Sequence, residues 1–277
     1  MRDPAENGQL ALLLEVAGTP KPGNVDRERE YENLRFEHFL AGAVGARAGL
    51  RAAADGAPIG EAFESAIEGM SDQSGGNTQF GALLVTVPLV RAAAEGRLTP
   101  DGASDTVEGT TVADACAFYK AFEHVDVAVD DPPEGLDELD VRRGAAAAEA
   151  LSERGLTLYD VMALSADRDG VAAEWCSGFE RSFEAAGWLR EDEGPVYRRA
   201  SRVFLRLLAA KPDTFVATRN GEAAAEEATQ RARAVLDGEA DAESLAEEFL
   251  ACDINPGTTA DITAGALFIA LERGLEV

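Results

Sequence analysis

The chain has 277 residues, a length that suits one large domain or two small ones. Hydrophobic residues make up 46% of it, enough for a sizeable core, so a wholly disordered chain is excluded. Its 51 acidic and 25 basic residues give a formal net charge of −26 without a visible basic patch, which argues against nucleic acid as a partner.

Helical periodicity runs through most of the chain, and strand alternation is almost absent. The pattern predicts an all-α fold, a multi-helix globular bundle whose site is formed by inter-helix loops. We expect one domain over residues 1–277, with an acidic connector at about 126–140 that contains Pro132, Pro133 and Gly135. The predicted helices cover about 10–16, 34–54, 59–70, 78–95, 111–124, 141–154, 159–165, 171–186, 196–210, 222–236, 242–251 and 258–273.

The acidic residues are spread along the whole chain rather than gathered in a tail. This spread is typical of adaptation to a salty cytoplasm, because molar salt screens the self-repulsion of a highly charged protein. Binding of a cationic partner is the alternative. Three scattered cysteines form no metal-binding pattern, and no apolar run reaches the length of a membrane span, so we expect a cytoplasmic protein that contacts no membrane.

The first of four polar loops follows the first predicted helix and reads TPKPGNVDR over residues 19–27. Two prolines bracket Lys21 and lower the entropy cost of holding it against a phosphate. Glu15 and Asp26 supply oxygen ligands of the kind that Mg²⁺ prefers. The alternative is a loop that ends a helix and carries an ordinary surface lysine.

The other three loops also combine turn residues with polar side chains. A glycine-rich turn ending in Asn77 and Thr78 opens a helix, where it either holds an anion or caps the helix. Asp213 and Arg219 suit a metal and a phosphate, or else a helix cap and a surface ion pair. In the fourth loop, Asp261 falls in the first turn of the last predicted helix, where the helix dipole alone favours an acid.

Together and in order, the four loops resemble the triphosphoribosyl-dephospho-CoA synthase family. The matching stretches are 15–26 (EVAGTPKPGNVD), 76–78 (GNT), 213–214 (DT) with 219–221 (RNG), and 255–261 (NPGTTAD). The resemblance implies an all-helical transferase that uses ATP as a substrate with Mg²⁺. In the implied reaction, the 2′-hydroxyl of dephospho-CoA attacks the ribose C1′ of ATP, adenine leaves, and the triphosphate stays on the ribose.

The resemblance also implies roles for individual residues. Metal ligands or a catalytic base are expected among Glu15, Asp26 and Asp261. The substrate-binding and phosphate-binding set is Lys21, Pro22, Gly23, Asn24, Gly76, Asn77, Thr78, Asp213, Arg219, Asn255 and Gly257. Two departures from the family pattern stand out. The stretch after Asp26 lacks the usual histidine and Asp-Met pair, and Gln79-Phe80-Gly81 stands where His-Lys-Gly is usual.

These departures leave alternatives open. A same-family transferase with another acceptor, in coenzyme or pterin-cofactor biosynthesis, would account for the missing histidine and lysine. A non-catalytic helical protein that binds nucleotides is a second alternative, and it predicts ATP binding without adenine release. The sequence does not define the oligomeric state, and a homodimer is compatible with it.

Overall fold

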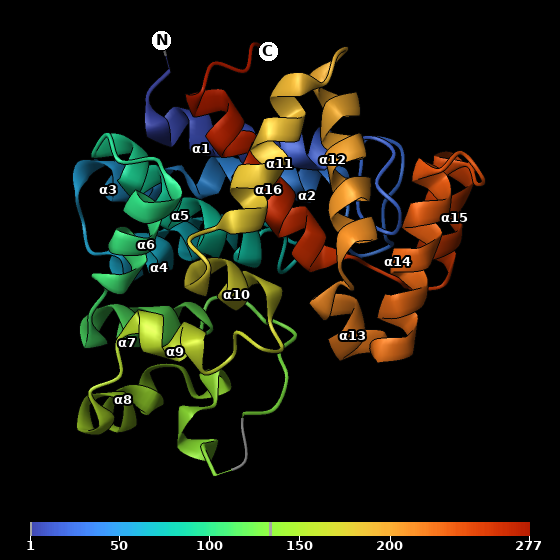
Figure 1. Ribbon diagram of the computed structural model, residues 1–277. Helices are drawn as coiled ribbons and strands as arrows, with labels where there is room; N and C mark the ends of the chain where they lie inside the picture. The colour runs from blue at the N-terminus through green and yellow to red at the C-terminus, as the bar shows by residue number, and fades with distance from the viewer. Residues whose placement is uncertain (1, 133–134) are drawn as a thin grey trace.

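The computed structural model describes residues 2–132 and 135–277 (Figure 1). Within these ranges there is no β-strand, and the prediction of an all-α globular bundle is confirmed. The α-helices are α1 (Pro4–Ala17), α2 (Phe36–Gly45), α3 (Arg47–Asp55), α4 (Ile59–Met70), α5 (Phe80–Ala94), α6 (Pro100–Glu108), α7 (Val112–Ala121), α8 (Ala148–Arg154), α9 (Leu158–Ala163), α10 (Gly170–Cys176), α11 (Glu180–Glu191), α12 (Val196–Ala210), α13 (Thr214–Asn220), α14 (Glu222–Leu236), α15 (Ala242–Ala251) and α16 (Gly257–Glu272). Two 3₁₀ helices, η1 (Asp137–Leu139) and η2 (Val141–Ala147), precede α8.

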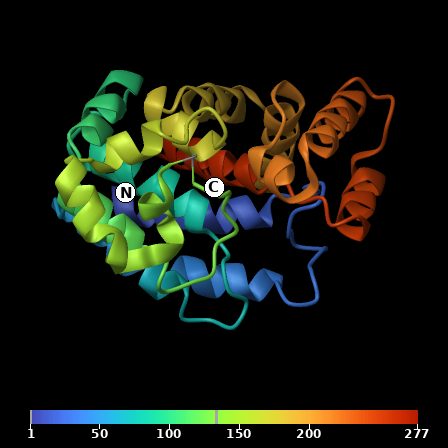
Figure 2. The same cartoon turned by 90° about the horizontal axis from the view of Figure 1, so that it is seen from below.

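The last helix, α16, passes through the middle of the molecule (Figures 1 and 2). Thirteen of its 16 residues are buried, and 11 of the 15 residues of α5 are buried as well. Helices that are apolar on all sides must be covered on all sides. Accordingly α1, α5, α11 and α12 pack around α16.

Helices α1 and α16 run antiparallel, and both chain ends lie at the same end of the molecule (Figure 1). At that end, the side-chain amide of Asn7 donates a hydrogen bond to Glu272 (2.7 Å). At the other end of the same helix pair lie Glu15 and Asp261, two of the predicted site residues. The packing that buries α16 therefore also brings these two carboxylates toward each other.

A smaller apolar cluster joins the second half of α12 to α14 and α15. Figure 1 shows α13, α14 and α15 along one side of the molecule, away from the group formed by α7, α8 and α9. The loop between α1 and α2 lies next to α15. Segments from opposite ends of the sequence therefore meet on this side of the molecule.

Several helix boundaries differ from the predictions. The predicted helix 34–54 is two helices that meet at Ala46, and 171–186 is also two, separated by Phe179 in a left-handed conformation (φ 61°). Helix α1 begins at Pro4 because Asp3 and Glu6 form a capping box. Helices α6 and α13 were not predicted. Thr99 caps α6 and a proline opens it, whereas α13 occupies most of the third predicted loop.

The acidic segment 126–140 is more than the expected solvated connector. Its Val127, Leu136 and Leu139 contact the core, and the hydroxyl of Tyr119 donates a hydrogen bond to the Leu139 carbonyl (2.7 Å). Pro133 lies outside the described residues. None of the helices in the described ranges has the length and apolarity needed to cross a bilayer. Cys176 and Cys252 are exposed, and Cys116 is half-buried.

Candidate active site

A cavity lies where the four polar loops meet. Seven of the predicted site residues line it, with at least one from each of the first, second and fourth loops, while the third loop contributes Thr214, Phe215 and Thr218. The loops are joined directly, because the Asn24 amide donates to Asn255 Oδ1 (2.9 Å). The predicted residues on the cavity wall are Glu15, Asn24, Asn77, Thr78, Asn255, Gly257 and Asp261.

Lys21 lies behind the cavity wall rather than on it. Its side chain is fully buried, and its ammonium group is paired with Glu15 and donates a hydrogen bond to Asn24 Oδ1 (2.9 Å). Burial raises the pKa of the Glu15 carboxyl, although Lys21 beside it acts in the opposite direction. Both partners of Lys21 face the cavity. Lys21 therefore positions two lining side chains, and the structure does not place it where a phosphate would bind.

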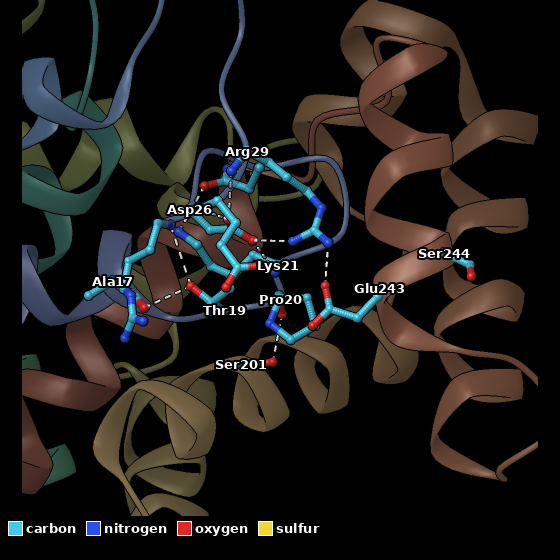
Figure 3. Close-up of polar contacts among 12 residues, drawn as sticks. Ala17, Thr19, Pro20, Lys21, Asp26, Arg29, Ser201, Glu243 and Ser244 are labelled. Atoms are coloured by element: carbon cyan, nitrogen blue, oxygen red, sulfur yellow. Dashed lines mark hydrogen bonds and ion pairs between the residues drawn. The ribbon is translucent and has the colours of Figure 1, made fainter.

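Asp26 also binds other parts of the protein rather than lining the cavity (Figure 3). Its carboxylate accepts hydrogen bonds from the backbone N–H groups of Lys21 (3.1 Å), Glu28 (2.8 Å) and Arg29 (3.0 Å). The Arg29 guanidinium pairs with Asp26 and also with Glu243 of α15. These contacts hold the first loop against α15 and leave Asp26 away from the cavity, so the predicted set of Glu15, Asp26 and Asp261 does not meet at one point.

Asp213 is also part of the framework. One of its oxygens accepts from the backbone N–H groups of Phe215 (2.9 Å) and Val216 (3.1 Å) at the start of α13. The other accepts from the N–H (2.7 Å) and hydroxyl (2.6 Å) of Thr259 on α16. The helix-cap alternative thus describes its local geometry. Asp213 joins the third loop to the fourth from behind the wall.

The remaining predicted residues lie away from the cavity wall. Arg219 is on the surface and pairs with Asp253 (3.1 Å). Gly76 is exposed, with open space around its Cα. Pro22 and Gly23 are buried in the first loop, and Gly23 has a positive φ of 72° in a place where a Cβ would lie 1.8 Å from the Ile254 carbonyl oxygen. Gly23 is thus required for the contact between the first and fourth loops.

Asp261 lines the cavity from the start of the second turn of α16 rather than from the first, because the helix begins at Gly257, one residue earlier than predicted. It packs against the first turn of α5, where a Cβ added to Gly81 would lie 2.0 Å from its Oδ2. Burial raises the pKa of Asp261 well above its usual value, and the nearby carboxylates of Glu15, Asp213 and Asp169 raise it further. A carboxyl group in this state is suited to exchanging a proton or binding a cation.

Asp169 is a lining carboxylate that the sequence reasoning missed. It caps α10, and its Oδ1 accepts from the backbone N–H groups of Val171 (2.7 Å) and Ala172 (3.0 Å). No described residue donates a hydrogen bond to its Oδ2, and the side chain is accessible to water in the cavity. The surrounding protein atoms displace water from the Asp169 carboxyl group, and this desolvation raises its pKa.

The second loop forms the start of α5. Asn77 Oδ1 accepts from the Phe80 N–H (3.0 Å), so Asn77 caps this helix start while it lines the cavity. Next to it, Gln79 donates to the Leu12 carbonyl (3.3 Å). Gln79 Oε1 and Thr78 Oγ1 are buried and have no partner among the described residues. Two polar atoms at the edge of the cavity are therefore left without hydrogen bonds.

Beyond α5 the cavity becomes apolar. Phe80, Phe118 and Phe122 form its aromatic wall, with ring centroids of Phe80 and Phe122 4.7 Å apart. Val161 and Met162 of α9 face the same space. The cavity wall thus contains a group of carboxylates and amides and a separate group of aromatic and aliphatic side chains, with Asp140 near Tyr119 on the aromatic side.

The charged side chains that line the cavity are mostly acidic. A triphosphate entering it would meet strong repulsion unless cations accompanied it. No group of three or more His, Cys, Asp or Glu side chains in the described ranges could hold a metal ion by itself. The lining acids are Glu15, Asp130, Asp140, Asp169 and Asp261, and the lining base is Arg168.

The fold and cavity define an all-helical protein whose loops assemble a carboxylate-rich pocket with an aromatic wall. The chain belongs to the ATP:dephospho-CoA triphosphoribosyl transferase family, whose model matches residues 1–276. It is also similar to a crystal structure from Archaeoglobus fulgidus, provisionally assigned as a triphosphoribosyl-dephospho-CoA synthase. The identity is 27% and the TM-score 0.72, over 87% of this chain and 100% of that one. No curated protein sequence matched the chain.

Proposed function

We propose that this cavity carries out the reaction of the family. A hydroxyl oxygen of dephospho-CoA bonds to the ribose C1′ of ATP, the bond from C1′ to adenine N9 breaks, and the triphosphate stays on the ribose. The observation that carries the proposal is the meeting of Glu15, Asp169 and Asp261 at one cavity in a chain of this family. Positive charge that develops at C1′ is stabilised by carboxylates beside it.

The acceptor hydroxyl must lose a proton as it attacks. Asp261 is suited to receive it, because its raised pKa makes the carboxylate a stronger base than an ordinary aspartate. Glu15 is held in place by Lys21 and has one oxygen free of that pairing. We therefore assign proton transfer to Asp261 and charge stabilisation to Glu15.

The triphosphate requires cations, and Mg²⁺ fits the residues present. Magnesium in nucleotide sites is held by one or two carboxylates together with substrate phosphates. Asp169 supplies such a carboxylate, because its Oδ2 has no donor among the described residues and it lines the cavity. A Mg²⁺ held there would neutralise phosphate charge and leave Asp261 free for proton transfer. In the proposal, Asp169 takes the place of the phosphate contact expected from Lys21 and the metal ligand expected of Asp26.

Adenine release tests the function. Purified protein is incubated with ATP, Mg²⁺ and dephospho-CoA in about molar KCl, which screens the acidic surface, and the bases are separated by chromatography. We expect adenine only when dephospho-CoA is present, and its loss in Asp261→Asn. The matched control is Asp237→Asn, which changes an exposed aspartate at the end of α14. Equal adenine release from Asp261→Asn and wild type would contradict the assignment.

A second candidate is the same transfer to a different acceptor. Two observations favour it. Phe80 stands where the family usually has lysine, and the described residues that line the cavity include five acids and a single base, Arg168. A panel of hydroxyl-bearing coenzyme and pterin precursors, offered in place of dephospho-CoA, distinguishes the two. Adenine release that depends on one of these compounds, with none from dephospho-CoA, supports the second candidate. ATP binding without adenine release from any acceptor supports a binding protein.

A further inference from the structure

The cavity has a second compartment whose role the transfer reaction does not by itself define. We infer that the aromatic compartment, formed by Phe80, Phe118, Phe122, Val161 and Met162, binds the adenine ring of ATP and retains it as the leaving group. The inference rests on the proposed use of ATP. It adds a location for the ring and a set of side chains that recognise it.

The five side chains of the compartment are aromatic or aliphatic and carry no charge, and the nearest charged group is Asp140 beside Tyr119. Phe118 and Phe122 meet edge to face, with centroids 5.3 Å apart and planes at 86°, and Phe122 is only half-buried. The nearest phenol, Tyr119, already donates to the Leu139 carbonyl. A flat aromatic ligand gains stacking and apolar contacts in such a space, whereas a phosphate or an ionised group would lose its hydration without compensation. This chemistry suits a nucleobase.

The position of the compartment follows from the covalent structure of ATP. Phe80 directly precedes Gly81, and Gly81 packs against the Asp261 carboxylate. A ribose C1′ held beside Asp261 carries adenine one bond away, so the ring lies at the Phe80 side of this first turn of α5. The triphosphate then extends toward the carboxylates and amides of the cavity wall.

The departing base also suits an uncharged compartment. When the C1′–N9 bond breaks, its electron pair goes to N9, and the proton lost by the acceptor hydroxyl is returned to the ring through the site carboxylates. Atoms and charge then balance, and adenine leaves as a neutral molecule. An aromatic wall binds the neutral base better than an anion, so the compartment favours the protonated product.

The test compares ligands with and without the ring. Binding of ATP and of inorganic tripolyphosphate, each with Mg²⁺ in about molar KCl, is measured by calorimetry for wild type and variants. Phe122→Ala is expected to weaken ATP binding roughly tenfold and to leave tripolyphosphate binding unchanged. Phe122→Tyr keeps the ring and should keep the ATP affinity. The control Phe36→Ala changes a half-buried phenylalanine of α2 away from the cavity and should affect neither ligand.

The outcomes separate this inference from the proposed function. If Phe122→Ala weakens both ligands equally, or neither, while its melting curve shows a folded protein, the aromatic compartment does not bind adenine. If the ring-dependent loss is seen but no adenine is released with dephospho-CoA, the compartment stands and the proposed acceptor fails. If wild type binds tripolyphosphate as tightly as ATP, the inference is refuted directly.

Discussion

Lys21→Met removes one partner of a fully buried ion pair and tests whether Lys21 organises the site. The lysine side chain has no exposed surface, and the Glu15 side chain that it pairs with is 4% exposed. Its ammonium group also donates to Asn24 (2.9 Å). Methionine has similar length and volume, so the substitution removes the charge and both contacts without opening a large cavity.

The expected cost is large because Glu15 is left buried without its counter-charge. Breaking a buried pair from one side costs about 3–5 kcal/mol. For a chain of this size, that lowers the melting temperature by roughly 6–20 °C. The matched control is Lys120→Met, because Lys120 is 50% exposed and lies 3.3 Å from Glu64. An exposed pair is worth at most about 1 kcal/mol.

Thermal unfolding is followed by circular dichroism for both variants and for Lys21→Met combined with Glu15→Gln, all in the same salt. The double variant should recover most of the lost stability, because a neutral amide leaves no unpaired charge in the interior. If Lys21→Met costs no more than Lys120→Met, or if Glu15→Gln restores nothing, the buried pair does not support the site as described.

Three further predictions concern stability. Because the pKa of Asp261 is raised, wild type should lose stability as the pH rises from below the usual aspartate range through that raised pKa, and Asp261→Asn should melt higher than wild type at pH 8. Gly23→Ala should cost more in denaturant unfolding than Gly56→Ala, which has a positive φ but open space and should cost about 1–2 kcal/mol. The melting temperature should rise between 0.1 and 1 M KCl, where the Debye length falls from about 10 to about 3 Å, because the net charge is −26.

Much of the fold could be predicted from apolar spacing, since most of the helices were expected close to their observed positions. The failures occurred where short-range signals were weak or overlooked. Ala46 interrupts a helical pattern that has no proline there. Both α2 and α3 pack on α1 and α4, and α3 packs on α5 as well. Helix α6 carried clear signals in Thr99 and Pro100 that apolar spacing alone does not register.

The site shows why the sequence alone does not distinguish carboxylates that line the cavity from carboxylates that only stabilise the fold. Asp169 and Asp213 have the same local role, because each uses one oxygen to accept two backbone N–H groups at a helix start. Only the tertiary environment of the second oxygen differs. In Asp213 it accepts from Thr259, and in Asp169 it faces the cavity. Local pattern selected Asp213 as a site residue and passed over Asp169, and no property of either loop could have reversed that choice.

The energetics of α16 support a functional role for Asp261 independently of any motif. Position 261 lies on an otherwise buried helix and packs against Gly81 of α5, where a small apolar residue would fit without any electrostatic cost. Instead the position holds a carboxyl whose pKa is raised by burial and by three other carboxylates. Because its pKa is raised, ionising it costs folding free energy, which the apolar contacts of α16 with α1 and α5 offset. A destabilising group retained at the meeting point of four loops is better explained by the chemistry it performs than by the packing it disturbs.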